Sequence, residues 1–192
     1  MNSLYVVEKN YDKIDFENNV LEQGEYEKCE FTNCSFYNTD ISEFIFVDCK
    51  FTACNLSMVK VRGTTFNNAY FENCKMLGIR FDNCNDFGLF VNFENCTLNH
   101  SSFFRKKIRN TKFNNSQLME VDFTQSDLTG SVFSSCELTR AVFDNTIIEK
   151  ADLRTSFNFS IDPENNRINK AKFSLIGITG LLDKYDIEIE GK

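Results

Sequence analysis

Several residue types are scarce in this chain of 192 residues. Tryptophan is absent, and proline and histidine occur once each, as Pro163 and His100. No run of about 18 apolar residues could form a membrane-spanning helix, and Met1 to Asn10 lack the basic and then apolar order of a secretory signal. We therefore expect a single cytoplasmic domain with no membrane partner.

Positive charge is also in short supply. Lys and Arg number 21 against 28 Asp and Glu, which gives a formal charge of -7 and a pI near 4.9. Phosphate contacts need clustered Lys and Arg, so this balance argues against direct binding to nucleic acid. Eight cysteines would suggest disulfides in a secreted protein, but without a signal sequence we expect reduced thiols.

What the chain has in abundance is phenylalanine, with 21 residues arranged at a spacing of five. Every fifth residue is apolar from Leu98 to Phe143, and an equivalent series runs from Phe16 to Phe81. Neither an α-helix, with a period near 3.6, nor a flat strand, with a period of 2, produces this spacing. The chain is therefore a repeat of five residues.

The five-residue series is interrupted once. Asp86 stands where an apolar residue is due, and the series resumes at Phe93, twelve residues after Phe81. Twelve residues equal two repeats plus two additional residues, so we predict a register slip at 86–89. Gly88 lies inside this segment and can adopt backbone conformations that other residues resist.

Two positions of each pentapeptide are predicted to point inward: the apolar centre, and the position two residues before it, which holds all eight cysteines. Metal or redox clusters would not need to follow a core period, so we interpret the cysteines as small buried side chains and expect no metal or cofactor. Grouping the centres by four reveals a period of twenty, so four pentapeptides form one turn and identical residues stack. The predicted inward ladder consists of Phe31, Phe51, Phe71, Phe93, Phe113 and Phe133, with Cys34, Cys54, Cys74 and Cys96.

The repeats resemble the A(D/N)LXX motif of pentapeptide-repeat proteins, as in Ser126-Asp127-Leu128-Thr129-Gly130 and Ala151-Asp152-Leu153-Arg154-Thr155. The resemblance covers about residues 14–175. It implies an all-β solenoid, specifically a right-handed quadrilateral β-helix, which here would have about eight coils. We expect this β-helix at 14–173, with a loop near 157–167. An N-terminal cap at 1–13 and a C-terminal helix and tail at 174–192 would close its ends.

A filled solenoid offers no concave pocket for catalysis, so we expect a protein that is not an enzyme. His100 lies at an outward position without a nearby nucleophile, which favours a surface histidine. Lys106 occupies an inward position, and we predict that it either extends outward or marks a bulge, because a buried unpaired ammonium is costly.

The outer residues offer two charged clusters, each of which could be a solvated surface or a partner surface. An acidic cluster near the N-terminus consists of Glu22, Glu25, Glu27 and Glu30. A basic cluster occupies a stretch that contains no acidic residue, and it consists of Arg105, Lys107, Arg109 and Lys112.

The resemblance also implies a function. Quinolone-resistance members of the family are thought to present an acidic rod, with the size and charge of duplex DNA, to DNA gyrase or topoisomerase IV. This predicts a type II topoisomerase as partner, although the long loops of the Qnr branch have no counterpart here beyond the slip. The alternative is a structural or adaptor module with no topoisomerase or nucleic-acid role.

The C-terminal segment admits two interpretations. Its apolar residues lie at helical spacing after Ser174, although Gly177 and Gly180 weaken a helix. The segment could be a lid on the last coil of a monomer. In related proteins that bind gyrase, a C-terminal helix pairs two subunits, which implies a homodimer contact here through Leu175, Ile178, Leu181, Leu182 and Tyr185.

Overall fold

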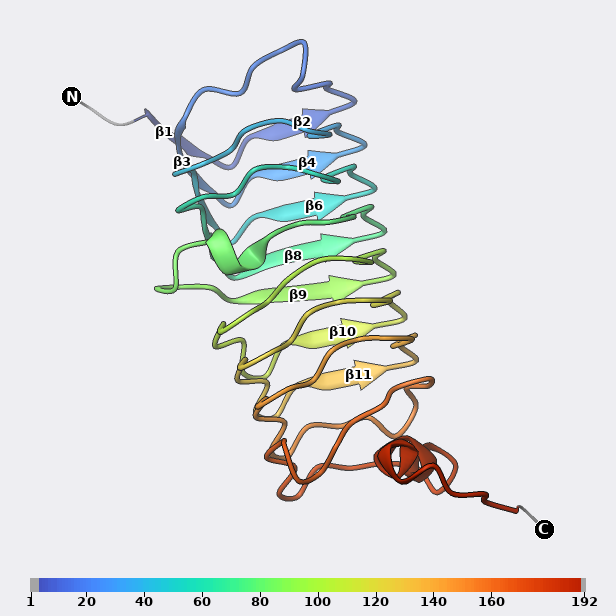
Figure 1. Cartoon of the computed structure of the whole chain (residues 1–192). Coiled ribbons are helices and arrows are strands. Elements are labelled where there is room, and N and C mark those ends of the chain that lie inside the picture. Colours follow the sequence, from blue (N-terminus) through green and yellow to red (C-terminus); the bar gives the residue numbers. More distant parts are fainter. Residues whose placement is uncertain (1–3, 191–192) are drawn as a thin grey trace.

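The computed structural model describes residues 4–190 as a rod of stacked turns (Figure 1). Each turn of about twenty residues lies directly on the previous one, because the inward positions recur with that period. The strands are short and all pair in parallel. They are β1 (Leu4–Val7), β2 (Asn10–Asp12), β3 (Gly24–Glu27), β4 (Glu30–Thr32), β5 (Ile45–Val47), β6 (Lys50–Thr52), β7 (Thr65–Asn67), β8 (Ala69–Glu72), β9 (Val91–Glu94), β10 (Lys112–Asn114) and β11 (Val132–Ser134).

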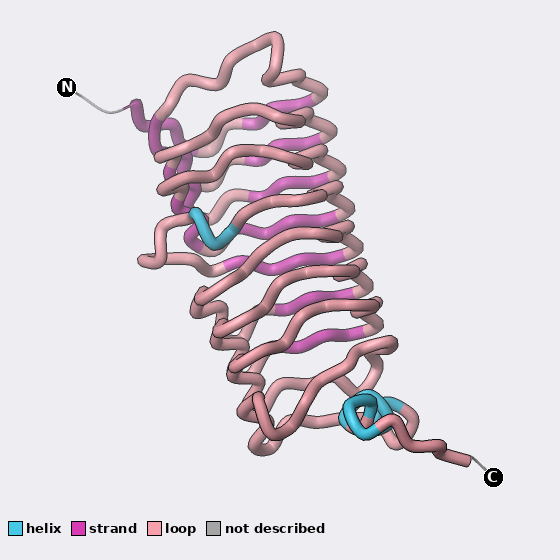
Figure 2. Tube along the Cα trace, viewed as in Figure 1, coloured by secondary structure: helices cyan, strands magenta, loops and turns pink. Residues whose placement is uncertain are grey.

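The strands form two stacked sheets on different sides of the rod, while most of the chain between them is turn and extended backbone (Figure 2). One side, here called the β2 face, carries seven strands in the order β11-β10-β9-β8-β6-β4-β2. Another, the β1 face, carries the four strands β1-β3-β5-β7. Isolated parallel bridges such as Asn55↔Lys75 and Asp40↔Lys60 join successive turns on the remaining two sides. The predicted all-β solenoid is thus confirmed, with about seven turns rather than eight.

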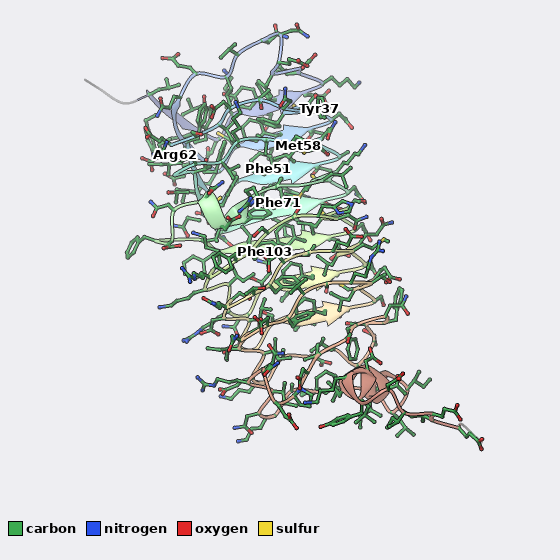
Figure 3. All side chains as sticks on the ribbon, viewed as in Figure 1. Tyr37, Phe51, Met58, Arg62, Phe71 and Phe103 are labelled. Atoms are coloured by element: carbon green, nitrogen blue, oxygen red, sulfur yellow. The ribbon has the colours of Figure 1, made fainter. Side chains whose placement is uncertain are left out.

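Phenylalanine rings fill the interior. The ring centroid of Phe51 lies 4.8 Å from that of Phe31 and 4.9 Å from that of Phe71, with nearly parallel planes. The step from Phe71 to Phe93 spans the slip and is the longest of this ladder at 5.5 Å. Phe103, from a neighbouring side of the coil, meets Phe93 edge-on at 6.1 Å. Figure 3 shows Phe51, Phe71 and Phe103 inside the rod. Each such aromatic pair adds about 0.5–1.5 kcal/mol beyond the burial of its area.

The corners between sides depend on one backbone conformation that the sequence interpretation did not identify. The residue two positions after nearly every centre has a positive φ, such as 54° at Asn73 and 59° at Met58. Twenty-five residues other than glycine adopt it within the described part of the chain, and none of them is β-branched. Nine are asparagine, which tolerates this region better than most residues. The enrichment of asparagine at this repeat position could have predicted the positive φ from the sequence.

The end of the coil differs from expectation. The predicted C-terminal helix is present only as two 3-10 segments, η2 (Gly177–Leu181) and η3 (Asp183–Tyr185), in addition to η1 (Phe81–Asn83) next to the slip. Gly180 lies close to the last turn, because a Cβ at this residue would lie 2.2 Å from the carbonyl oxygen of Phe159. The segment therefore follows the surface of the last turn, and Leu181 packs against the core.

Residues 157–167, expected as a loop, are an irregular part of the last turn. Phe157 bridges to Glu137 in the turn before, and Phe159 and Ile161 are buried. At the other end, β1 and β2 already pair with the next turn, so the coil extends to residue 4. Residues 1–3 of the expected cap and 191–192 of the expected tail lie outside the described part of the chain.

Candidate interaction surface

All eight cysteines are free thiols, and all are buried. The Sγ of Cys54 lies 3.2 Å from the carbonyl oxygen of Phe31 in the previous turn. The hydroxyl of Thr64 donates to the carbonyl of Ile41 in the same way, at 2.7 Å. Cysteine and threonine at this inward position thus bond the previous turn, whereas Ala69 and Val121 fill the same position without a side-chain donor. The five-residue period located this position in the sequence. The occurrence of serine and threonine beside cysteine there could also have predicted the hydrogen bonds to the previous turn.

Burial also makes two of these thiols poor nucleophiles. Removal from water raises the pKa of Cys49 and of Cys136 to about 12, although backbone hydrogen bonds act in the opposite direction. A thiol with such a high pKa is almost fully protonated at neutral pH, and only the thiolate is a good nucleophile or metal ligand. The interior therefore offers no nucleophile from these two residues.

The described residues can be searched for groups that would hold a metal ion. Among residues 4–190, no group of three or more His, Cys, Asp or Glu side chains could hold a metal ion, and no helix is long and apolar enough to cross a bilayer. The hollows lie at the two ends of the rod and beside the slip. His100 is exposed, with its Nδ1 at 3.0 Å from a carboxylate oxygen of Glu120.

The acidic cluster forms a collar around the N-terminal end of the rod rather than a stripe along it. Glu25 and Glu27 belong to β3 on the β1 face, whereas Glu30 belongs to β4 on the β2 face. Glu22 precedes β3 and lies on the adjoining side. Tyr5 donates a hydrogen bond to Glu27, and this contact lowers the pKa of that carboxyl group. The collar thus presents negative charge on three sides of one end.

The basic cluster is divided in the same manner. Lys107 and Arg109 lie on the β1 face, Arg105 lies at the corner before it, and Lys112 begins β10 on the β2 face. Arg109 is neutralised by Asp127, whose carboxylate accepts from its Nε at 2.8 Å. Burial raises the pKa of Asp127, but the hydrogen bonds from Arg109 and Thr129 outweigh it and leave the pKa below its usual range.

Lys106 forms an ion pair with Asp86, which lies in the slip. Of the two predicted alternatives, an outward side chain or an irregularity of the coil, the first is not observed, because the side chain is buried and bonded to residues of the irregular turn. The Nζ atom donates to the carbonyl of Cys84 at 2.7 Å and also bonds the carboxylate of Asp86. One turn later, the backbone N–H of Asp127 donates to the carbonyl of Lys106. The lysine ammonium thus takes the place of a backbone donor where the two additional residues distort the ladder.

The slip also exposes two aromatic side chains that sequence interpretation missed. It projects as a loop from the side that carries β1 and β3 (Figure 1). Phe87 is 88% exposed and Phe90 is 61% exposed. A hollow beside the loop is lined by Phe90 with Asn67, Asn68, Arg109 and Asn110. The sequence could have indicated these exposed side chains, because Phe87 in the slip and Phe90 directly after it do not fall on the inward period.

The C-terminal residues expected to form a dimer contact separate into two groups. Leu175 is 88% exposed, and Ile178 and Tyr185 are also exposed. Leu181 and Leu182 are half-buried, with Leu181 packed against the core of the same chain. The segment therefore packs on the last turn through Leu181 and leaves apolar side chains exposed at the end of the rod.

Two sequence-family models match this chain. The family model for a pentapeptide repeat region matches residues 24–87, and the model for pentapeptide repeats in eight copies matches residues 116–154. Together these segments make up more than half of the sequence. The chain belongs to the pentapeptide-repeat family. No curated protein sequence matches this pentapeptide-repeat chain.

Solved pentapeptide-repeat structures share its fold. A trypsin-treated variant of QnrB1, a plasmid-mediated fluoroquinolone resistance protein, superposes with a TM-score of 0.76 at 17% identity, covering 98% of this chain and 92% of that one. Full-length QnrB1 gives a TM-score of 0.64 at 16% identity, with 97% and 100% coverage. HetL from the cyanobacterium Nostoc gives 0.40 at 12% identity, with 88% and 87% coverage. At these identities the likeness establishes the fold alone.

Proposed function

We propose that the chain is a non-enzymatic interaction protein whose partner is a type II topoisomerase, either DNA gyrase or topoisomerase IV. The observation that carries this proposal is the match to QnrB1 along nearly the whole length of both rods. QnrB1 is a fluoroquinolone resistance protein, and the family resemblance implies that such rods bind gyrase in place of DNA. The proposed role for this chain is therefore protection of the enzyme against quinolones.

The acidic collar is the proposed contact. Its carboxylates surround one end of a rod whose net charge is -7, so this end can enter a basic groove that normally binds DNA. The basic cluster lies farther along the rod than the collar, and one of its four residues, Arg109, is already paired with Asp127. The rod would thus insert by its N-terminal end.

Gyrase supercoiling, measured with and without ciprofloxacin during titration of the purified protein, tests this proposal. We expect inhibition or protection at micromolar protein, and loss of the effect in the variant Glu22→Gln, Glu25→Gln, Glu27→Gln, Glu30→Gln. The matched control carries the same change of charge at the other end, as Asp144→Asn, Asp186→Asn, Glu188→Gln, Glu190→Gln. A wild type without any effect on gyrase or topoisomerase IV would remove the topoisomerase role.

The exposed C-terminal apolar residues favour a second candidate function, an adaptor module with no topoisomerase or nucleic-acid role. Leu175 and Ile176 are 88% and 87% exposed, and apolar side chains gathered at one end can pair two rods end to end. The mass of the Leu175→Asp, Ile176→Asp variant in solution tests this pairing. A mass equal to that of the wild type removes it.

A further inference from the structure

The β1 face separates its charges by sign at the slip. In the turns before the slip, outward positions hold four acids and one lysine, which gives a net charge of -3. These residues are Glu8, Glu25, Glu27, Lys28 and Asp48. In the turns after the slip, five bases and two acids give a net charge of +3. These residues are Lys107, Arg109, Asp127, Glu149, Lys150, Arg167 and Lys170.

The adjacent β2 face does not separate its charges. Glu30 is in register with Lys50 on this face, and the Nζ of Lys50 lies 2.8 Å from a carboxylate oxygen of Glu72 in the next turn. Alternating signs of this kind are neutralised within the chain. The β1 face also contains ion pairs, Arg109 with Asp127, Arg167 with Glu149 and Lys28 with Glu27. Its remaining charges are nevertheless separated by sign, because Glu8, Glu25 and Asp48 belong to the acidic half, and Lys107, Lys150 and Lys170 to the basic half.

The slip lies at the midpoint of the β1 face. The centres Val6, Tyr26, Phe46 and Phe66 precede it, and Ile108, Leu128, Ile148 and Ile168 follow it. The exposed side chain of Phe87 and the hollow beside Phe90 both belong to this midpoint. When a second copy is rotated by 180° about an axis through this midpoint, the Phe87 side chain of each copy can fit the hollow of the other.

We propose that two copies of the chain pair through their β1 faces, antiparallel, around a two-fold axis at the slip. This arrangement brings each acidic half against the basic half of the other copy along about 40 Å, which is eight steps of about 4.8 Å from the centre Val6 to the centre Ile168. It also allows Phe87 of each copy to enter the hollow of the other. A parallel arrangement would oppose like charges, and duplex DNA would be repelled by the acidic half.

Light scattering of the full chain in solution, together with two double variants, tests the pairing. The wild type is expected at twice the chain mass of 22.3 kDa. Glu8→Lys, Glu25→Lys makes both halves positive, and Lys107→Glu, Lys150→Glu makes both halves negative. Both substitution pairs use residue types that already occur at equivalent repeat positions, so the fold is retained. Each variant alone is expected as a monomer, whereas a mixture of the two is expected to restore the dimer.

Two controls separate this face from other surfaces. Glu17→Lys, Asp144→Lys changes the net charge equally but lies on other sides of the rod, and we expect it to remain a dimer. Leu175→Asp is also expected to remain a dimer, whereas a dimer held by the C-terminal end would dissociate. A monomeric wild type overturns the proposal, as does a variant that stays dimeric alone or a mixture that stays monomeric.

Discussion

At the scale of single residues, the inward position two before each centre lies beside the stacked rings, and most side chains there are small. Cysteine, serine and threonine can also donate to a carbonyl of the previous turn, as Cys136, Ser156 and Thr146 do. Val121 and Ala151 occupy the same position without a donor. The cysteines are therefore interchangeable with hydroxyl residues and need no thiol chemistry.

Substitutions at Cys136 test this interpretation. Cys136→Ser keeps a small donor facing the carbonyl of Phe113, so we expect the free energy of unfolding to change by less than about 1 kcal/mol. Cys136→Leu inserts additional atoms into a fully buried position and should destabilise by about 1–3 kcal/mol. Urea denaturation measures both. Equal losses for the two variants would contradict the need for a small donor at this residue.

A corner residue offers a second prediction at this scale. Asn73 has a φ of 54°, a region in which a β-branched side chain collides with the backbone. We expect Asn73→Val to lower the free energy of unfolding by about 1–2 kcal/mol, whereas Asn73→Gly at the same site should be much better tolerated. Thermal unfolding of the two variants provides the comparison, and a valine variant as stable as the glycine variant would refute it.

At the scale of elements, the slip is an irregular turn stabilised from inside the rod. Two additional residues displace the backbone between β7 and the next turn of the β1 face, and Lys106 extends into the space to bond Cys84 and Asp86. The same displacement exposes Phe87. One insertion thus creates both an internal ion pair and an external aromatic projection.

Lys106→Met is the test of this turn. The methionine keeps most of the volume but leaves the carbonyl of Cys84 without the ammonium donor, which we expect to cost about 1–3 kcal/mol. Lys107→Met is the matched control, because Lys107 is exposed and should change stability by less than about 0.5 kcal/mol. The urea denaturation midpoints of the two variants measure this difference. Similar midpoints would show that the buried lysine contributes nothing to the free energy of unfolding.

The C-terminal element illustrates how packing overrides a local pattern. Apolar spacing predicted a helix, but Gly177 and Gly180 lie against Phe159, which closes the last turn. The N–H of Ile161 donates to the carbonyl of Gly180 at 2.9 Å, so this glycine is joined to the coil through its backbone. The two glycines that weakened the helix are the residues that permit the close contact.

At the scale of the whole molecule, a filled interior dictates where function can reside. Rings and thiols occupy the inside of the rod, so outward side chains alone are free to bind partners. Figure 3 shows Tyr37, Met58 and Arg62 on the outside of the same turns that enclose Phe51. The interior also makes stability dependent on pH, because many of its small residues are ionisable thiols.

We expect the protein to lose stability at alkaline pH. Burial raises the pKa of Cys49 and Cys136 from 9.0 to about 12, so the unfolded chain releases these protons first. Stability from these groups is therefore complete below about pH 9 and falls progressively between pH 9 and 12. Urea midpoints measured in reductant from pH 7.5 to 10.5 should fall less steeply for Cys49→Ser, Cys136→Ser. If the urea midpoints of variant and wild type fall with pH at the same slope, Cys49 and Cys136 are not the cause of the alkaline loss of stability.

The sequence by itself determined the fold, because every turn buries the same two positions and the period of five records that burial directly. It also located the slip, since two additional residues shift every later centre. It did not predict that Lys106 and Asp86 pair or that the last segment lies flat, because both depend on backbone approach in space. The tertiary structure alone decided which charges share a side. Residues twenty apart become neighbours when the chain closes each turn, and only then do Glu25 and Lys107 lie on one face with opposite signs at its two ends.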